Sequence, residues 1–422
     1  MWKNIGNAPA FMVSQWQFYR LKHLLLQHFL HNPFYRAILN EAGFASRADL
    51  EKFKWGDLAR IPILGKDAFR EQPVENCIAK NVPRSRFRER STSGSTGNPF
   101  RFWIDLKYQK CWQSIYTKAW RQQGHEENLK LVIAQVIQES GNYPPHRLFI
   151  SGLKLYEDVH AFETVKKVLD FGGRGIISFP SFLIEFCNLL EKFYPNIKKP
   201  VFETVFTSGE ALSESDREFI KNGLGCEIFD RYGVTEFFIV GQECGQHDGF
   251  HLNPESHIFE VVDDKGAPLS AGDEGKIVIT NLDNEIMPFV RYDTGDLGRF
   301  LPKRCLCGNP APLFKIRERR NIPKIWVMSG RKINPFLFYE LFLDQSGIIQ
   351  YYQIRKKSEN HIQILVVPGR KFIPAALDIW KERVGKALPT DAIRIDFVLT
   401  DKIPPAPNGK RQDFVDEKAL IQ

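Results

Sequence analysis

Apolar side chains recur at helical spacing near the start of the chain. Between residues 16 and 30, Phe18, Leu21, Leu25 and Phe29 fall on one face before Pro33 interrupts the pattern. The spacing predicts an amphipathic helix whose apolar face packs against a core. A helix lying on a membrane surface is the alternative, but the polar face carries few Lys or Arg residues, which disfavours it.

The middle of the chain alternates short apolar runs with longer helical patterns. Between residues 129 and 229 the helical patterns fall at 159–171 and 213–224, and this alternation predicts α/β layers. Beyond residue 250, short β-rich runs at 258–262 and 276–280 replace it. We therefore expect an α/β fold that includes a small β subdomain.

A second domain is expected because 422 residues exceed one ordinary core. A charge run and a proline near residues 317–323 separate the β-rich part from a last segment of about 100 residues, a reasonable size for a small domain. The predicted division is a large multi-layer N-terminal domain, 1–318, whose part from about 244 to 310 is β-rich, and a small α+β C-terminal domain, 319–422.

Composition narrows the class of protein. No stretch approaches the roughly 20 apolar residues that span a bilayer, and residues 1–6 lack a signal-peptide pattern. Seven cysteines without a regular framework favour a reducing compartment. We expect a cytoplasmic protein without stable membrane insertion.

The net charge of +8 leaves several classes of partner open. Arg84, Arg86, Arg88 and Arg90 alternate with other residues, which fits a solvated basic surface or the attraction of phosphate-bearing small molecules. The chain has no zinc-finger spacing, RNA-binding signature or stacked aromatic pattern beside these arginines, so nucleic acid is the less favoured partner.

A loop rich in Ser, Thr and Gly follows Arg90. Its glycines let backbone N–H groups approach an anion, and its hydroxyls add rotatable donors, so the loop suits phosphate. It lacks the lysine of a Walker A loop, and an isolated loop of this composition is more often a solvated turn. The residues concerned are Ser91, Thr92, Ser93, Gly94, Ser95, Thr96 and Gly97.

Further polar motifs stand where apolar, strand-like runs end. In open α/β sheets, ligands gather at such ends. A final motif places a lysine on a loop rich in Gly and Pro. The motifs are Ser208, Gly209, Glu210 and Ala211, then Tyr232, Gly233, Val234, Thr235 and Glu236, then Asp296, and last Lys410.

In this order the motifs resemble the adenylate-forming superfamily, in particular its branch of phenylacetate–CoA ligases and relatives from capsule and secondary-metabolite clusters. The resemblance covers essentially the whole chain. It begins at residues 32–36 and 58–67, includes 180–183, and ends at the Lys410 loop. It implies a C-terminal domain that rotates about a hinge near 318–321, although Glu318 and Asn321 depart from the family pattern there.

The resemblance implies a role for each motif. Residues 91–97 would cradle the β- and γ-phosphates of ATP, Thr235 would bind the α-phosphate and Glu236 would bind Mg²⁺. Residues 208–211 would line the adenine pocket with Tyr232 stacked beside the base, and Asp296 would hold the ribose. Gly233 and Arg319 complete the predicted ATP site. Lys410 would reach the carboxylate and the α-phosphate as the catalytic lysine.

The acid-binding pocket is less defined by the sequence. Phe237 and Phe238 directly follow Glu236, which makes them the preferred pair for contacting the substrate. An aromatic-rich core explains such residues equally well.

A separate set of residues suits structural zinc. Cys244, His251, Cys305 and Cys307 would supply three thiolates and an imidazole for tetrahedral coordination. The Cys-x-Cys spacing is not typical, His247 and His257 compete for the histidine position, and ordinary buried or free thiols are the alternative.

We therefore expect an AMP-forming ligase that activates an aromatic or other apolar acid with ATP and transfers the acyl group to CoA. One alternative delivers the acyl group to a carrier-protein thiol or to an amine or hydroxyl. Another is a relative that has the fold without turnover, although the intact Thr235, Glu236, Asp296 and Lys410 speak against it. A homodimer is a further expectation.

Overall fold

The chain is described by a computed structural model, which resolves two compact units. The first unit comprises residues 1–90, 101–128 and 229–320, and the second comprises 91–100, 129–228 and 321–422. Within these units the structure describes residues 8–91, 100–108, 129–135, 146–156, 158–210, 212–318, 326–333, 337–338, 348–369, 371–388, 392–403 and 414–417.

The first unit opens with a helical segment. Its helix α1 is longer than the predicted 16–30, and its buried side chains include Leu21, Leu24 and Leu25, so the predicted core face is confirmed. Asn32 ends α1 and caps α2, where its side chain accepts a hydrogen bond from the backbone N–H of Tyr35. The helices are α1 (Ala10–His31), α2 (Pro33–Glu41), α3 (Arg47–Glu51), η2 (Trp55–Arg60), α4 (Lys66–Arg70), α5 (Val74–Cys77) and η3 (Arg84–Arg86).

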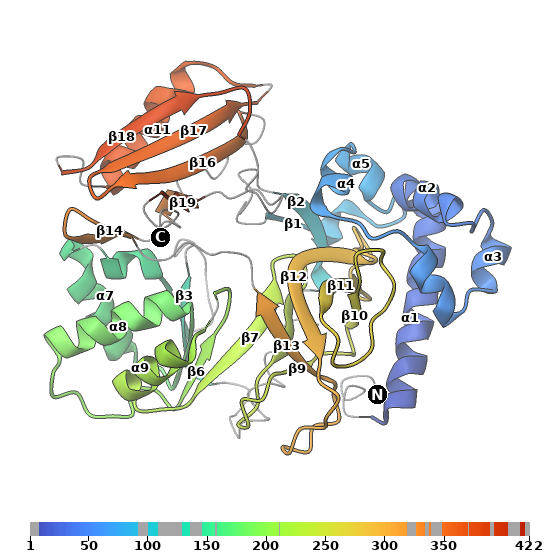
Figure 1. Ribbon diagram of the computed structural model, residues 1–422, viewed down its shortest axis with the longest axis horizontal. Helices are drawn as coiled ribbons and strands as arrows, with labels where there is room; N and C mark the ends of the chain where they lie inside the picture. The colour runs from blue at the N-terminus through green and yellow to red at the C-terminus, as the bar shows by residue number, and fades with distance from the viewer. Residues whose placement is uncertain are drawn as a thin grey trace. The chain divides into compact units, whose positions relative to one another are not determined.

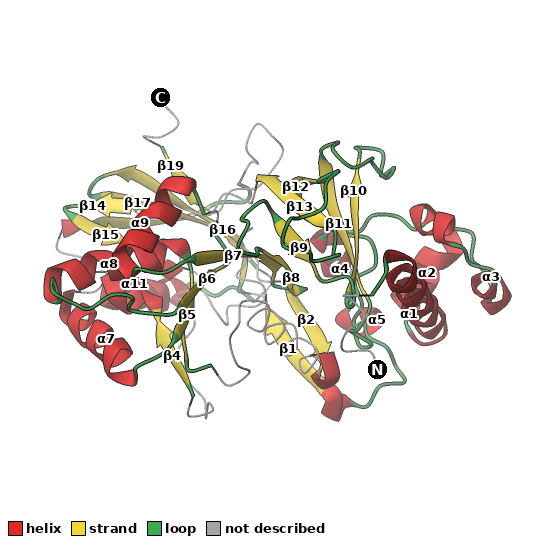
Figure 2. Cartoon of the chain, turned by 90° about the horizontal axis from the view of Figure 1, so that it is seen from below, coloured by secondary structure: helices red, strands yellow, loops and turns green. Residues whose placement is uncertain are grey.

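An antiparallel sheet forms the rest of the first unit. Its strands follow the order β10-β11-β12-β13-β9-β8-β7, and α1 and α2 lie beside its β10–β11 end (Figures 1 and 2). The strands predicted at 258–262 and 276–280 are β10 and β11, paired along their length. The strands are β7 (Ile228–Val234), β8 (Phe238–Gln242), β9 (Phe250–Leu252), β10 (His257–Val262), β11 (Gly275–Asn281), β12 (Tyr292–Phe300) and β13 (Leu313–Glu318), with a separate pair β1 (Phe87–Ser91) and β2 (Arg101–Asp105).

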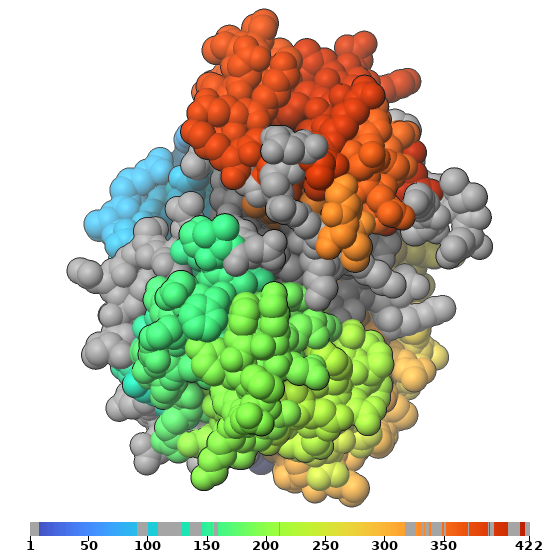
Figure 3. Space-filling view, turned by 90° about the vertical axis from the view of Figure 1, so that its left-hand side faces the viewer, coloured from blue at the N-terminus to red at the C-terminus, as the bar shows by residue number. Residues whose placement is uncertain are grey.

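The second unit begins with a parallel sheet in the order β6-β5-β3-β4. Three helices pack on it around a core that includes Phe182, Val205 and Ile220, and their outer surface is the green face in Figure 3. The helical patterns predicted at 159–171 and 213–224 are confirmed. The elements are β3 (Leu131–Gln135), β4 (Arg147–Ser151), η4 (Gly152–Tyr156), α7 (Asp158–Phe171), β5 (Gly175–Ser178), α8 (Pro180–Phe193), β6 (Thr204–Thr207) and α9 (Glu214–Leu224).

The C-terminal part of the second unit has its own sheet, in the order β18-β17-β16-β19, and its own core around Trp380. The mixed α/β fold is thus confirmed, while the predicted division at 318/319 remains a prediction. No described helix is long and apolar enough to cross a membrane. The elements are β14 (Trp326–Met328), β15 (Arg331–Ile333), β16 (Ile349–Ser358), β17 (His361–Pro368), α11 (Ala375–Ala387), β18 (Arg394–Leu399) and β19 (Phe414–Asp416).

Candidate active site

Two predicted nucleotide-site residues of the first unit are in direct contact. The Tyr232 hydroxyl on β7 donates a hydrogen bond to Asp296 Oδ2 on β12 over 2.9 Å, and both side chains are buried. A hydrogen bond to a carboxylate fixes its direction and is stronger than one between neutral groups. Asp296 is therefore held in one orientation, as a residue that binds ribose hydroxyls requires.

The turn between β7 and β8 carries the Gly-Val-Thr-Glu motif. Any residue with a Cβ at position 233 would clash with the backbone, because the Cβ would lie 1.9 Å from the carbonyl oxygen of Phe238. Glycine thus allows the two strands to approach closely here. In the turn that follows, Thr235 is exposed and Glu236 is buried, so the two predicted phosphate- and metal-binding residues differ in their contact with solvent.

The Glu236 carboxylate contacts two side chains from other parts of the first unit. The Tyr292 hydroxyl donates to Glu236 Oε1 over 2.6 Å, and Lys66 Nζ lies 3.3 Å from the same oxygen. Sequence reasoning did not assign a role to either residue. Lys66 stands in the 58–67 signature and Tyr292 stands four residues before Asp296, so their positions were the available signal.

Phe237 and Phe238 occupy different environments. Phe237 is buried, and its ring contacts His257, Phe289 and Tyr292 at centroid distances of 5.5–5.8 Å. This position favours the core alternative for Phe237. Phe238 is half-buried and has a left-handed backbone with φ of 59°, a conformation that is costly for a bulky residue. A substrate contact remains a prediction for both.

The second unit carries the predicted adenine loop. After β6, Gly209 has a φ of 82°, and a Cβ there would lie 2.6 Å from the Phe179 ring. Glu210 is buried and turns to α8, where it accepts hydrogen bonds from the Ser181 backbone N–H (2.9 Å) and from the Ser181 hydroxyl (2.8 Å). The carboxylate therefore ties the loop to the first turn of α8, a role that sequence reasoning missed.

Burial gives Glu210 a distinct pH dependence. It raises the pKa of Glu210 to about 7, against the hydrogen bonds from Ser181 that act in the opposite direction. The stability that Glu210 contributes should therefore be fully present below pH 4.5 and be lost as the pH rises through 7. In urea unfolding, the free-energy difference between wild type and Glu210→Gln should fall across this window. Glu191→Gln, on the exposed side of α8, is the control, and a difference independent of pH would contradict the prediction.

Several predicted site residues lie outside the described part of the chain. Ser91 is described only as the last residue of β1. The others are Thr92, Ser93, Gly94, Ser95, Thr96, Gly97, Ala211, Arg319 and Lys410. Their assigned roles stay predictions.

The structure brings the four predicted zinc ligands together in the first unit. The candidate ligand atoms of Cys244, His251, Cys305 and Cys307 all lie within 4.8 Å of one another. Cys244 Sγ is 3.6 Å from Cys305 Sγ, and Cys307 Sγ is 3.3 Å from His251 Nε2. The cluster joins the segment after β8, strand β9 and the β12–β13 connection. Three sulfurs and one imidazole nitrogen at these separations fit a tetrahedral zinc ion.

The competing histidines lie elsewhere. The His247 ring stacks on Phe229, and its Nδ1 is 3.2 Å from Glu243 Oε2. His257 is buried beside Asn281, and burial lowers the pKa of His257 to about 4. The described geometry therefore selects His251 among the three candidates.

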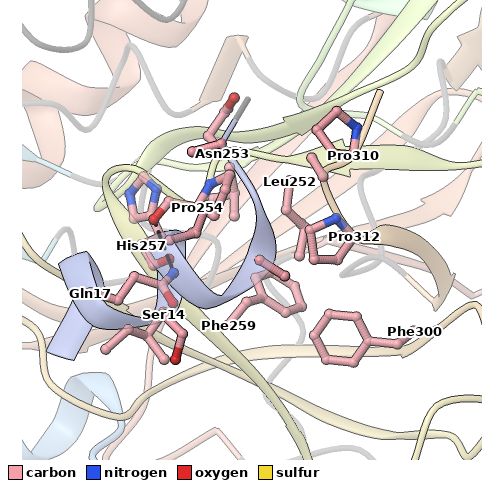
Figure 4. Close-up of a pocket in the computed structure, with 16 residues that line it drawn as sticks. Ser14, Gln17, Leu252, Asn253, Pro254, His257, Phe259, Phe300, Pro310 and Pro312 are labelled. Carbon is pink, nitrogen blue, oxygen red and sulfur yellow. Dashed lines mark hydrogen bonds between the residues drawn. The ribbon is translucent and has the colours of Figure 1, made fainter. Parts of the chain in front are cut away.

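A cavity of about 200 Å³ opens between α1 and strands β9 and β10 (Figure 4). Val13, Leu252, Phe259 and Phe300 make its wall mainly apolar. The side-chain amide of Gln17 donates hydrogen bonds to the backbone oxygens of Pro254 and His257. Among the predicted catalytic and ATP-binding residues that the structure describes, none lines this cavity.

The chain is similar in sequence to curated enzymes. Curated phenylacetate–coenzyme A ligases from Thermus thermophilus and Pseudomonas putida are 29% and 26% identical to this chain. The matches cover 81% and 82% of this chain and 77% and 79% of those ligases. No protein-family model matches the chain.

A solved structure shares the fold. A 2-hydroxyisobutyryl-CoA ligase in its postadenylation state, in complex with R3-HIB-AMP, matches with a TM-score of 0.65 at 19% identity. The match covers 99% of this chain and 92% of that one. The chain is thus a homologue of the phenylacetate–coenzyme A ligases and has the fold of the adenylate-forming ligases.

Proposed function

We propose that this protein is an AMP-forming ligase that activates an aromatic or other apolar carboxylic acid with ATP and transfers the acyl group to CoA. The observation that carries the proposal is the homology to phenylacetate–coenzyme A ligases over about four-fifths of the chain. The buried Tyr232–Asp296 and Glu236 arrangement supports it, because these are polar groups of the kind a nucleotide and a metal require.

The reaction needs charge neutralisation and alignment. A carboxylate is a poor acyl donor, so it attacks the α-phosphate of ATP, pyrophosphate leaves, and the resulting acyl-adenylate can react with a thiol. Asp296, oriented by Tyr232, would hold the ribose, and Thr235 would donate to the α-phosphate. Lys410 would contact the carboxylate and the α-phosphate, where negative charge is redistributed.

Magnesium fits the chemistry of Glu236. Its carboxylate is a hard oxygen donor, and bound Mg²⁺ would neutralise phosphate charge. Lys66 and Tyr292 orient the carboxylate in advance. The Cys244, His251, Cys305 and Cys307 cluster would hold a structural Zn²⁺ ion.

The acceptor is proposed to be CoA. A second structure of the 2-hydroxyisobutyryl-CoA ligase, in complex with 2-HIB-AMP and CoA, has a TM-score of 0.64 and shows this fold with both ligands. No described feature favours a carrier protein or an amine acceptor. The partners proposed here are ATP, a small carboxylic acid and CoA.

The proposal is tested by carboxylate-dependent exchange of labelled pyrophosphate into ATP. A panel of aromatic, fatty, hydroxy and amino acids is assayed with the purified full chain, and the active acid is then assayed for its CoA thioester. We expect exchange with an aromatic or apolar acid and a thioester product. Exchange without a thioester would reject CoA as acceptor, and no exchange from a folded, ATP-binding protein would reject the ligase.

A further inference from the structure

The N-terminal segment delivers a lysine to Glu236 by joining strand β12. The Leu64 backbone N–H donates to the Arg291 carbonyl oxygen over 3.0 Å, and the Asp293 N–H donates to the Leu64 carbonyl oxygen, also over 3.0 Å. Leu64 thereby forms a parallel bridge to Tyr292. Lys66 begins α4 two residues later, so the backbone of β12 fixes the point from which its side chain extends.

A buried arginine anchors the same segment. Arg291 donates from its guanidinium to the carbonyl oxygens of Ala59 (3.0 Å) and Ile61 (2.8 Å), and it pairs with Glu260 at 3.1 Å. Its side chain is only 2% exposed, and breaking a buried charged contact of this kind is strongly destabilising. The position of Lys66 is therefore set by a rigid part of the first unit.

The Lys66 ammonium and the Tyr292 hydroxyl converge on one oxygen, Glu236 Oε1. The Lys66 side chain is 12% exposed and that of Glu236 is 2% exposed. Water screens such a pair poorly, so a divalent cation that approaches Glu236 meets repulsion from the ammonium.

We infer that Lys66 sets the affinity of Glu236 for the divalent cation. The ammonium lies beside the buried carboxylate, so a metal that binds Glu236 must either displace the ammonium or bind against its charge. Lys66 is thus a positioning residue that keeps the Glu236 carboxylate aligned while making metal binding depend on the nucleotide, whose phosphates would supply the remaining negative charge. The inference rests on the proposed function, because it assumes that Glu236 is the metal ligand.

Replacing Lys66 with methionine removes the charge and keeps an unbranched apolar side chain. At saturating β,γ-methylene-ATP, Lys66→Met should bind Mn²⁺ about tenfold more tightly than wild type, because a neighbouring positive charge is lost from a poorly screened site. Electron paramagnetic resonance measures free Mn²⁺ directly and requires no turnover. Nucleotide affinity is measured separately without metal, so that any change in it is not assigned to the cation.

Further variants complete the design. Lys52→Met removes an exposed lysine at the end of α3 and should leave Mn²⁺ affinity unchanged. Lys66→Arg keeps the charge and should stay within about threefold of wild type. Lys66→Gln is the uncharged variant to use if Lys66→Met does not fold. Equal or weaker Mn²⁺ binding by Lys66→Met, or an uncharged variant that matches Lys66→Arg, overturns the inference. Saturable Mn²⁺ binding in wild type that persists in Glu236→Gln overturns the proposed metal ligand instead.

Discussion

Replacing Lys410 with alanine should slow acid adenylation by roughly 10²- to 10³-fold, the scale of losing one transition-state stabiliser. The ammonium is proposed to contact the attacking carboxylate and the α-phosphate as negative charge shifts between them, and alanine offers no substitute. Thioester formation from a preformed acyl-adenylate should be spared, because that half-reaction no longer involves the pyrophosphate leaving group.

Pyrophosphate exchange measures the first half-reaction, and thioester release from added acyl-adenylate measures the second. Lys402→Ala is the matched control, since Lys402 is an exposed lysine eight positions earlier in the chain, and it should retain both activities. An unchanged exchange rate in Lys410→Ala would remove the lysine from the proposed mechanism. Equal losses in both half-reactions would point to a general defect in the C-terminal part.

Cys305→Ser should abolish stoichiometric zinc and destabilise the first unit by about 4 kcal/mol or more, as losses of structural metals do. For a cooperative unit the size of the first unit, that corresponds to an unfolding midpoint lower by about 10 °C. We expect a large loss of stability because the cluster holds separate segments of the chain together. It connects the segment after β8, strand β9 and the β12–β13 connection, so one ion would link three chain segments.

Metal content is measured by mass spectrometry on protein purified without chelators, and stability is measured by thermal unfolding. Cys226→Ser is the control, because Cys226 is a half-buried cysteine of the second unit outside the cluster. Wild-type protein that lacks stoichiometric zinc would contradict the prediction. So would a Cys305→Ser protein no less stable than Cys226→Ser.

Local patterns in the sequence predicted secondary structure well. The 3.6-residue period located α1, α7 and α9, and the short β-rich runs located β10 and β11. These elements depend on which face of a single segment is apolar. The pairing of residue 64 with β12 was not predicted, because it joins segments more than 220 positions apart and neither carries a local mark of the contact.

The sequence predicted which residues form the candidate site, but it did not predict most of the contacts between them. Sequence spacing left three histidines open for the metal cluster, and only the fold brings His251 to the cysteines. The contact of the Glu210 carboxylate with Ser181 was not predicted, and the place of Glu210 in the adenine pocket stays a prediction. The sequence did not single out Lys66 as a site residue, because its contact with the buried Glu236 carboxylate forms only in the folded chain.

The discontinuous first unit also constrains how the chain folds during synthesis. Helix α1 bonds to backbone oxygens at Pro254, His257 and Leu282, and residues 1–90 share their unit with 229–320. At about 5 to 20 residues per second, a ribosome needs roughly 10 to 50 s to make the intervening chain. Through that interval α1 can pack against α2 and α3 but lacks its contacts with the later segments. We therefore expect nascent chains to bind chaperones at this helix until the last strands of the unit emerge.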